Sequence, residues 1–561
     1  MTQSENETRR PDARQSLRAT VSRKRLVMIL VGIMLGMLLA ALDQTIVGTA
    51  MPRVIAELNG LEHYAWVATS YMLASTVVVP IYGKLSDIYG RRPFFIGGMV
   101  LFLIGSALSG ASQDMVQLIV FRAIQGFGAG ALMPISQAIV GDIFPPAQRA
   151  KWQGIMMATF GFATIVGPTA GGWITDNLGW RWVFYVNLPV GLLAILTAGF
   201  TLPREIRFRQ HRIDYLGATA LVGCALPLLL AFSWAGSIYQ WMSPQIVGLL
   251  AFAATMCAVF LLIERRASEP IISLSLFKNR IFSVSVIASF LVSGGMFGAT
   301  MYLPLFVQGV IGVSATNSGA VLTPMMLGFV VSTIVGGQLI SRTGRYKLIA
   351  LTGLAIGTVG MLLLSQMDVD TTQGLVMRNM AITGLGLGVA MTLFTIVVQN
   401  AFPMHQLGEV TASLQFFRSI GGTISIAVLG SVMINRFHDA FQSNLPGSLR
   451  QVVPADKLVA LQNPQVLLSP GAMDKLGETF ASLGPQGQEL SRQLMEAIRL
   501  SLASAISGLF VIGACIMALS LIATIFLREI PLRKTHQHPL DEGQADARDS
   551  GEAAPGVVGI D

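Results

Sequence analysis

Charged residues are scarce in this chain. They make up 12% of its 561 residues, whereas hydrophobic residues make up 53%. Because a typical soluble domain is about one quarter charged, this ratio excludes a water-soluble fold of such length. The first 22 residues are polar and lack the apolar stretch of a cleavable signal peptide, so we expect none.

Cysteines and catalytic motifs are also few. Cys224, Cys257 and Cys515 each lie in an apolar run, and their spacing fits neither a disulfide framework nor a metal site. The sequence has no Walker-type phosphate loop and no convincing nucleophile triad. We therefore expect no metal, no cofactor, no enzymatic activity and no use of ATP as the energy source.

Basic residues outnumber acidic ones, which gives a net charge of +8 and a pI of about 9.6. Such a balance occurs in nucleic-acid-binding proteins. An excess of Lys and Arg in cytoplasmic loops is equally the normal pattern of membrane proteins. With so few charges overall, we expect the second explanation and no nucleic-acid partner.

Long apolar runs are the dominant positive feature. A bilayer core of about 30 Å is crossed by about 20 apolar residues in a helix. The sequence has about fourteen such runs, near residues 27–48, 64–82, 93–111, 115–139, 153–174, 182–202, 213–234, 244–263, 282–304, 318–340, 347–366, 376–399, 411–434 and 503–527. This pattern predicts an all-α, multi-pass protein of the plasma (inner) membrane.

The basic residues indicate the orientation. With a cytoplasmic N-terminus, the short inner loops hold roughly 23 Lys and Arg, among them Arg25, Arg91 and Arg265, and the outer loops about three. This bias predicts that both termini are cytoplasmic, and an odd number of spans would break it. Residues 435–502 then form one long outer segment, either a solvated loop with short surface helices over 454–462 and 471–499 or a vestibule beside the exit.

The two halves of the chain resemble each other. Gly83–Arg92 reads GKLSDIYGRR, and a similar string, GQLISRTGR, begins at Gly337. The QGFGAG string that begins at Gln125 likewise has a counterpart at Thr383. Such repeats mark transporters built from two similar halves with the substrate site between them.

The repeat predicts a domain layout of two six-helix bundles joined by two inserted helices. The predicted parts are a cytoplasmic tail over 1–26, a first bundle over 27–203, two linking helices over 204–281, a second bundle over 282–530 and a tail over 531–561, without fixed structure.

Asp43 is the most informative residue, because a carboxylate within a membrane span is costly unless it is paired or hydrated. Arg122, in the fourth run, lies at a similar depth and is the natural partner. A carboxylate that is partly desolvated beside an arginine can titrate as water enters and leaves, which is what proton coupling needs. The alternative is a static buried ion pair.

Three further groups are candidates. Gly83 and Gly90 allow close helix contact, while Asp87 and Arg91 can form a charge-assisted clasp at a cytoplasmic gate; Arg92 is better explained as a basic anchor of the loop. The fifth run holds small residues four apart and a proline, which suits a bendable outer gate: Gly167, Pro168, Gly171 and Gly172. Arg418, close to Gln415, faces a cavity or caps helix carbonyls, and the sequence leaves both open.

Together these motifs resemble the major facilitator superfamily, and most nearly its fourteen-span drug:proton antiporters of the EmrB/QacA type. Gly83–Arg92 is similar to the superfamily's loop motif. The other residues that carry the resemblance are Asp43, Thr45 and Pro52 in the first span, Arg122, Gln125, Gly126 and Gly130 in the fourth, and Gly167, Pro168, Gly171 and Gly172 in the fifth. The resemblance implies two six-helix bundles plus two linking helices, and proton coupling at Asp43 and Arg122. It also implies a central cavity, and the candidate residues to line it are Thr45, Gln415 and Arg418.

The chain departs from this family in two places. Ser341 stands where the first half has Asp87, so we expect the clasp in one half only. No acidic residue lies within the predicted spans between 282 and 434, whereas some relatives carry carboxylates there that contact cationic drugs. A neutral or amphipathic substrate, or a monocation using Asp43, is therefore expected rather than a dication.

The expected function is proton-coupled export of amphipathic small molecules (multidrug efflux) by alternating access. One alternative is export of a single natural product or lipid, and the reason to consider it is the long outer segment. An alternative of another class is a membrane receptor or scaffold that does not transport. The expected partners are the substrate, protons and the bilayer, with a periplasmic adaptor if the source cell has two membranes.

Overall fold

The computed structural model describes residues 22–58, 64–203, 214–236, 238–312, 315–446 and 484–532. The first bundle comprises α2 (Arg23–Leu58), α3 (Tyr64–Tyr89), α4 (Arg91–Ala111), α5 (Met115–Ile143), α6 (Pro146–Asn177), α7 (Trp182–Tyr185) and α8 (Asn187–Thr201). The linking pair is α9 (Tyr215–Trp234) and α10 (Pro244–Glu264). The second bundle comprises α11 (Arg280–Gly309), α12 (Ala315–Thr343), α13 (Lys347–Ser365), α14 (Gln373–Ala401), α15 (Leu407–Asn444) and α20 (Gly484–Ile525).

These helices confirm the predicted all-α membrane fold. Thirteen described helical segments are long and apolar enough to cross a membrane, and α6 makes a fourteenth if its two parts, Lys151–Thr164 and Thr169–Asn177, count as one span. The two parts meet at an angle of 40°. The break includes Gly167 and Pro168, where proline removes a backbone donor from the helix.

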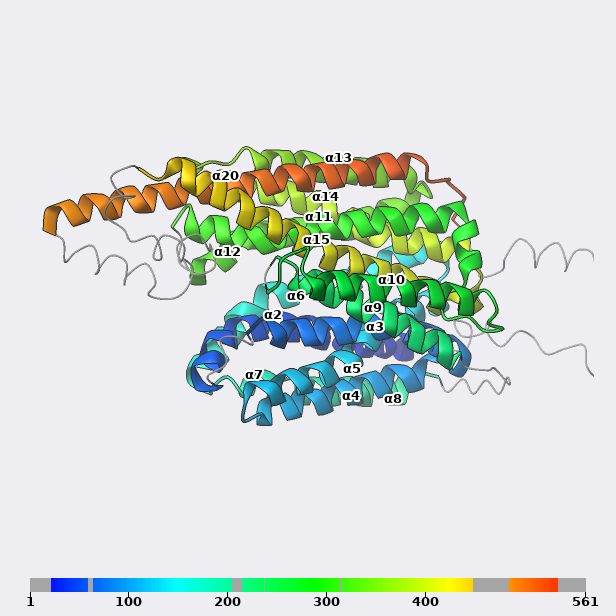
Figure 1. The fold of residues 1–561 in the computed structure, drawn as a ribbon. Coiled ribbons are helices and arrows are strands. Elements are labelled where there is room, and N and C mark those ends of the chain that lie inside the picture. The colour runs from blue at the N-terminus through cyan, green and yellow to red at the C-terminus, as the bar shows by residue number, and fades with distance from the viewer. Residues whose placement is uncertain are drawn as a thin grey trace, which may run out of the picture.

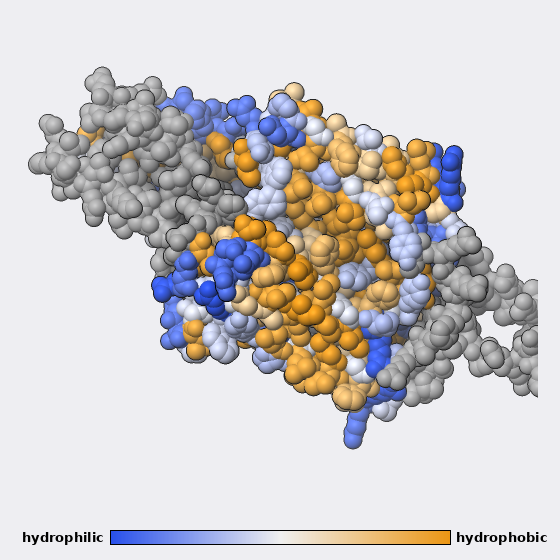
Figure 2. Space-filling view, turned by 60° about the horizontal axis from the view of Figure 1, so that its bottom comes forward, coloured by the Kyte–Doolittle hydropathy of each residue, from blue (hydrophilic) through white to orange (hydrophobic). Residues whose placement is uncertain are grey.

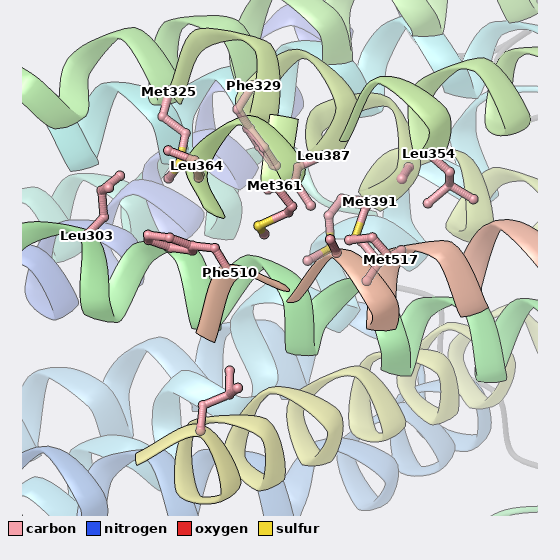
Figure 3. Close-up of a cluster of buried hydrophobic side chains, with 14 of the residues drawn as sticks. Leu303, Met325, Phe329, Leu354, Met361, Leu364, Leu387, Met391, Phe510 and Met517 are labelled. Carbon is pink, nitrogen blue, oxygen red and sulfur yellow. The ribbon is translucent and has the colours of Figure 1, made fainter. Parts of the chain in front are cut away.

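The two bundles lie side by side, the first in blue and cyan and the second in green to red (Figure 1). Each has its own apolar core. The core of the second bundle is rich in methionine, and Met325, Met361, Met391 and Met517 all belong to it (Figure 3). Flexible thioether side chains fill irregular gaps between helices.

The linking pair packs beside the boundary between the bundles. Buried residues of α9, such as Leu221 and Leu229, share an apolar cluster with Val77 of α3 and Phe416 of α15. Helix α9 therefore contacts both bundles, and α10 packs on α9.

The exterior is apolar where a soluble protein would be polar. Phe200, Leu216 and Met242 are more than two-thirds exposed. Figure 2 shows hydrophobic residues as a broad band with hydrophilic residues toward its two edges. A surface of this kind is stable only against lipid.

Two helices extend further than the sequence predicts. Helix α15 continues to Asn444 and α20 begins at Gly484, so residues 435–444 and 484–502 are helical rather than part of the predicted loop 435–502. Residues 484–499 continue the last span instead of forming a separate surface helix, because Leu494 and Ile498 pack in the same core as Phe437 and Phe441. With 42 residues, α20 is about 63 Å long, and its first part projects beyond the bundles (Figure 1).

The remaining predictions for the outer segment and the tails fall on residues 447–483, 1–21 and 533–561, which lie outside the described residues. For orientation within the fold, the end of the bundles that holds Gly90 is here named the Gly90 end. The opposite end, which holds the turn between α6 and α7, is named the Gly179 end.

Candidate functional site

Asp43 and Arg122 form a buried ion pair toward the Gly179 end. Asp43 lies in α2 and is 0% exposed, and Arg122 lies in α5 and is 2% exposed. The Arg122 Nη1 donates to Asp43 Oδ2 at 2.6 Å. The two depths inferred from the sequence therefore do bring these side chains together.

Gln125 closes this pair into a triad. Its Nε2 donates to Asp43 Oδ1 at 2.8 Å, and its Oε1 accepts from Arg122 Nη1 at 2.7 Å. Gln125 and Arg122 are three residues apart on α5, which places both on one face of the helix. The carboxylate of α2 is therefore held by two side chains of α5.

Sequence reasoning missed two members of this cluster. Asn187, the first residue of α8, donates to Asp43 Oδ1 at 3.1 Å and to Ser106 Oγ at 3.0 Å. The Tyr71 ring lies 4.2 Å from the Arg122 guanidinium carbon, within cation–π range. A polar Asn inside the apolar run 182–202 was the only signal for the first, and nothing in the sequence singles out Tyr71.

A cavity of about 120 Å³ lies between the bundles. Its lining residues come from five helices and carry no charged side chain: Met37, Ala40, Ala41, Gln44, Tyr71, Ser75, Thr76, Val79, Ala129, Gly130, Met133, Pro134, Phe160, Gln415 and Ser419. Tyr71 connects this cavity to the Asp43 cluster, because its ring contacts Arg122. Asp43 itself does not line the cavity.

Of the three residues predicted for the cavity, only Gln415 lines it. Thr45 instead donates to the Ala163 carbonyl of α6 at 3.1 Å. Arg418 is buried beside the cavity and donates to the Met391 carbonyl at 3.0 Å, so it does cap a helix carbonyl.

The loop motif forms the predicted clasp at the Gly90 end. Asp87 and Arg91 make an ion pair at 2.5 Å, and Arg91 Nε also donates to Asp142 at 2.9 Å. Asp87 in addition accepts from the backbone N–H groups of Gly408 and Glu409, at 3.1 and 2.6 Å. The clasp therefore reaches the first turn of α15 in the other bundle, which the sequence did not predict.

Glycine is required at two positions of this motif. A Cβ at Gly83 would collide with Ala412 and with the Gly408 carbonyl oxygen, so this glycine lets α3 and α15 touch. Gly90 has φ 96°, a left-handed conformation that favours glycine. In the second half, Gly344 also has a positive φ, but Arg345 is exposed and forms no ion pair with any described residue.

Further polar contacts join the bundles at the Gly90 end. Lys84 lies 3.4 Å from Glu409 of α15 and 3.0 Å from Glu269, which follows α10. Gln399 of α14 accepts from Gln153 at 2.9 Å, and its backbone carbonyl accepts from Arg149 at 3.0 Å. With the clasp, these contacts hold the bundles together at the Gly90 end, and together they are named the seal.

Glu409 corrects one prediction. The sequence placed the start of this span at 411 and found no acidic residue within it, but α15 begins at Leu407 and Glu409 is 5% exposed. Because it lies in the first turn of the helix and binds Lys84, it belongs to the seal and not to the cavity.

The predicted small-residue motifs hold helices close together. A Cβ at Gly126 or Gly130 of α5 would strike the α3 backbone at Tyr71 and Ser75. A Cβ at Gly167 or Gly171 of α6 would strike Thr45 and Thr49 of α2, whereas one at Gly172 would meet nothing within 4 Å. Pro168 lies between these glycines on α6.

No group of three metal-ligating side chains occurs among residues 22–58, 64–203, 214–236, 238–312, 315–446 and 484–532. The cluster holds a fully buried carboxylate by hydrogen bonds, and the cavity can hold a small apolar molecule with a few hydrogen-bonding groups.

Comparison with known proteins identifies relatives over most of the chain. A family model described as Major Facilitator Superfamily matches residues 33–426. Multidrug transporter protein MdtP of Bacillus subtilis is 38% identical over 93% of this chain and 96% of its own length. Multidrug resistance protein 3 of the same organism is 41% identical over 75% of this chain and 82% of its own length.

Solved structures of low sequence identity share the fold. The human organic anion transporter MFSD10 superposes with a TM-score of 0.56 at 15% identity, covering 88% of this chain and 99% of that chain. The fucose:proton symporter FucP of E. coli gives a TM-score of 0.53 at 13% identity, covering 91% of this chain and 100% of that chain.

Proposed function

The chain belongs to the major facilitator superfamily and is a membrane transporter rather than an enzyme, and on this premise we propose that it exports amphipathic small molecules in exchange for protons. We place it in the fourteen-span EmrB/QacA branch and assign the Gly90 end to the cytoplasm. Two relatives named as multidrug proteins, at 38% and 41% identity, support the export of varied compounds.

The observation that carries the proposal is the enclosure of Asp43. This carboxylate is fully buried and is held by Arg122, Gln125 and Asn187. Tyr71, whose ring contacts Arg122, also lines the cavity. A carboxylate whose charge depends on such contacts is stable as an anion only while the contacts last. Movement of α2 against α5 therefore couples a proton at Asp43 to the shape of the cavity.

The cycle follows from the seal at the Gly90 end. With that end closed, a proton enters from the outer side, binds Asp43 and weakens its attraction to Arg122. The bundles then rock, the seal opens, and the cavity faces the cytoplasm, where the proton leaves and substrate enters. Return to the sealed state restores the ion pair and releases substrate outside.

The test is uptake into everted membrane vesicles with an imposed proton gradient, acidic inside. The wild-type protein should accumulate an amphipathic dye, and Asp43→Asn should not. Asp176→Asn is a matched control, because Asp176 is an exposed carboxylate at the Gly179 end. Wild-type accumulation by Asp43→Asn would refute Asp43 as the coupling group, and dye binding without gradient-driven flux would favour a receptor or scaffold.

A second candidate is export of one specific natural product or lipid. The projection of α15 and α20 beyond the bundles favours it, since helices of that length are not needed to cross the bilayer. Replacing residues 447–483 with a flexible linker discriminates: unchanged drug resistance with lost lipid transfer would support this candidate.

A further inference from the structure

Arg418 is a buried cation with no carboxylate partner among the described residues. It is 6% exposed and lies in the first half of α15. Its Nη2 donates to the Met391 carbonyl and to Thr395 Oγ1, its Nη1 donates to Gln415 Oε1 at 3.2 Å, and its Nε has no partner in the described part of the chain. All of these acceptors are neutral.

Arg122, another buried arginine, differs in this respect. Arg122 faces Asp43 at 2.6 Å. Glu409, the nearer to Arg418 of the two acidic residues on α15, lies nine positions away, or about 13 Å along the axis, and is bound to Lys84 and to the backbone N–H of Ser273. An unpaired charge in a low-dielectric interior is costly, which makes a temporary counter-ion favourable.

Arg418 also lies beside the cavity. Gln415 and Ser419, on the same helix, both line the cavity, and the Gln415 side chain accepts from Arg418. One neutral amide therefore separates the guanidinium from the space where substrate fits. A guanidinium binds an anionic oxygen more strongly than a neutral amide oxygen, because both partners of the hydrogen bond are then charged.

We propose that Arg418 is an anion-binding site and that the preferred substrates are amphipathic molecules with one negatively charged group. The anion displaces Gln415 Oε1 and accepts the hydrogen bond from Nη1 of Arg418 in its place. The apolar part of the molecule lies against Met37, Met133 and Phe160, which line the same cavity. This inference rests on the proposed export function and specifies its substrate class.

The remaining electrostatics of the cavity agree with this substrate class. No acidic side chain lines the cavity, and Asp43 is already held by three donors. A monocation would therefore meet no free carboxylate there and would be repelled by Arg418. The expectation that a monocation uses Asp43 is not favoured in this conformation.

The proposal has a consequence for charge movement. Export of a neutral molecule against n protons carries n positive charges inward, whereas export of a monoanion against the same protons carries n + 1. With no pH gradient, a membrane potential negative on the cytoplasmic side should therefore drive export of the anion faster than export of a neutral analogue.

The test compares two fluorescent probes with the same ring system. 8-Anilinonaphthalene-1-sulfonate is an anion, and N-phenyl-1-naphthylamine is its neutral analogue. Binding is titrated with the full-length protein in lipid nanodiscs, with empty nanodiscs subtracted. We expect Arg418→Gln to weaken sulfonate binding about tenfold or more, the effect of losing one good charged contact, and to leave binding of the neutral probe unchanged.

Two variants control the measurement. Arg418→Lys keeps the charge and should retain much of the sulfonate binding, while Arg342→Gln removes an exposed arginine of the same bundle and should change neither probe. Unchanged binding of the neutral probe also shows that Arg418→Gln is folded.

The outcomes separate the inference from the function on which it rests. Equal effects of Arg418→Gln on both probes, or none on the sulfonate, would overturn the anion site. Loss of all Arg418-dependent sulfonate binding when gluconate is replaced by chloride would overturn the assignment to substrate, because the site would then be one for an inorganic anion. Selective sulfonate binding without gradient-driven flux of either probe would instead overturn the proposed export and leave the anion site standing.

Discussion

At position 43 a carboxylate is fully enclosed by protein, and among the described residues its only charged neighbour within hydrogen-bond distance is Arg122. Removing one member of such a pair leaves the other charge buried and alone, which typically costs about 3–5 kcal/mol, whereas removing both costs much less. The free energy lost when both side chains are removed is therefore not the sum of the losses for removing each one alone.

This asymmetry predicts an order of stability. Arg122→Gln should lower the melting temperature of the purified protein more than the double variant Asp43→Asn/Arg122→Gln does. Asp43→Asn alone should be milder, since Arg122 keeps Gln125 and the Tyr71 ring. Thermal unfolding followed by intrinsic fluorescence measures all three; strictly additive losses would mean that the two side chains do not interact.

The residues of the site were predicted to different degrees. Asp43 and Arg122 could be matched because a charge in an apolar run stands out and helical rise gives its depth. Asn187, Gln153 and Gln399 could not, because neutral polar residues are common in such runs and their partners lie on helices far apart in sequence. Glu409 was missed because a helix end cannot be fixed to two residues from composition alone.

At the scale of elements, the contact of α2 with α6 depends on two glycines. Thr45 and Thr49 of α2 lie where a Cβ at Gly167 or Gly171 would be. Because Gly172 points into open space, it provides a matched control on the same helix.

Gly167→Ala and Gly171→Ala should each separate α6 from α2, at a cost of about 1–3 kcal/mol for overpacking, and should reduce transport in vesicles several-fold. Gly172→Ala should transport at the wild-type rate. If all three variants transported equally, close α2–α6 packing would not matter for the cycle.

The seal at the Gly90 end is the second element-scale feature. Gln399 accepts from Gln153 and donates to the Gln137 carbonyl, so one side chain connects α14 with α5 and α6. Each such bond contributes about 0.5–1.5 kcal/mol net, and a shift of 1.4 kcal/mol changes a two-state ratio about tenfold.

Gln399→Ala should therefore shift the protein toward the state open at the Gly90 end. Spin labels at the exposed residues Tyr89 and Arg345, one in each loop motif, report the distance between the bundles there. We expect the population at the longer distance to increase in the variant. An unchanged distance distribution would show that Gln399 does not hold the bundles together.

The presence of each helix was easier to predict from the sequence than its length. All the apolar runs correspond to helices, because a membrane span must satisfy its backbone hydrogen bonds internally. The extensions of α15 and α20 were not predicted, because their polar residues indicate a loop when the sequence is considered alone. In the structure, Leu494 and Ile498 belong to the same apolar core as Phe437 and Phe441.

At the scale of the whole molecule, the internal repeat predicts two bundles of similar architecture. The charged side chains buried in the two bundles nevertheless differ. The first bundle holds the Asp43–Arg122 pair, and Arg418 of the second has no carboxylate partner within the described chain. We infer that the halves divide the work, with proton binding in the first and recognition of the substrate's charge in the second.

Orientation is a whole-molecule prediction. In a variant without Cys224, Cys257 and Cys515, a cysteine at the exposed Asn177 should react with a membrane-impermeant maleimide in intact cells. A cysteine at exposed Arg345 should react only after permeabilisation. The reverse pattern would place the Gly90 end outside and invert the proposed direction of transport.

The central claim is that one proton-binding carboxylate, Asp43, couples the two fluxes. Its most direct test is proton movement driven by substrate in proteoliposomes that contain a pH-sensitive dye and start without a pH gradient. A substrate gradient should drive protons in the opposite direction in the wild-type protein, and Asp43→Asn should move none. Substrate-driven proton flux at the wild-type rate in Asp43→Asn would contradict the account.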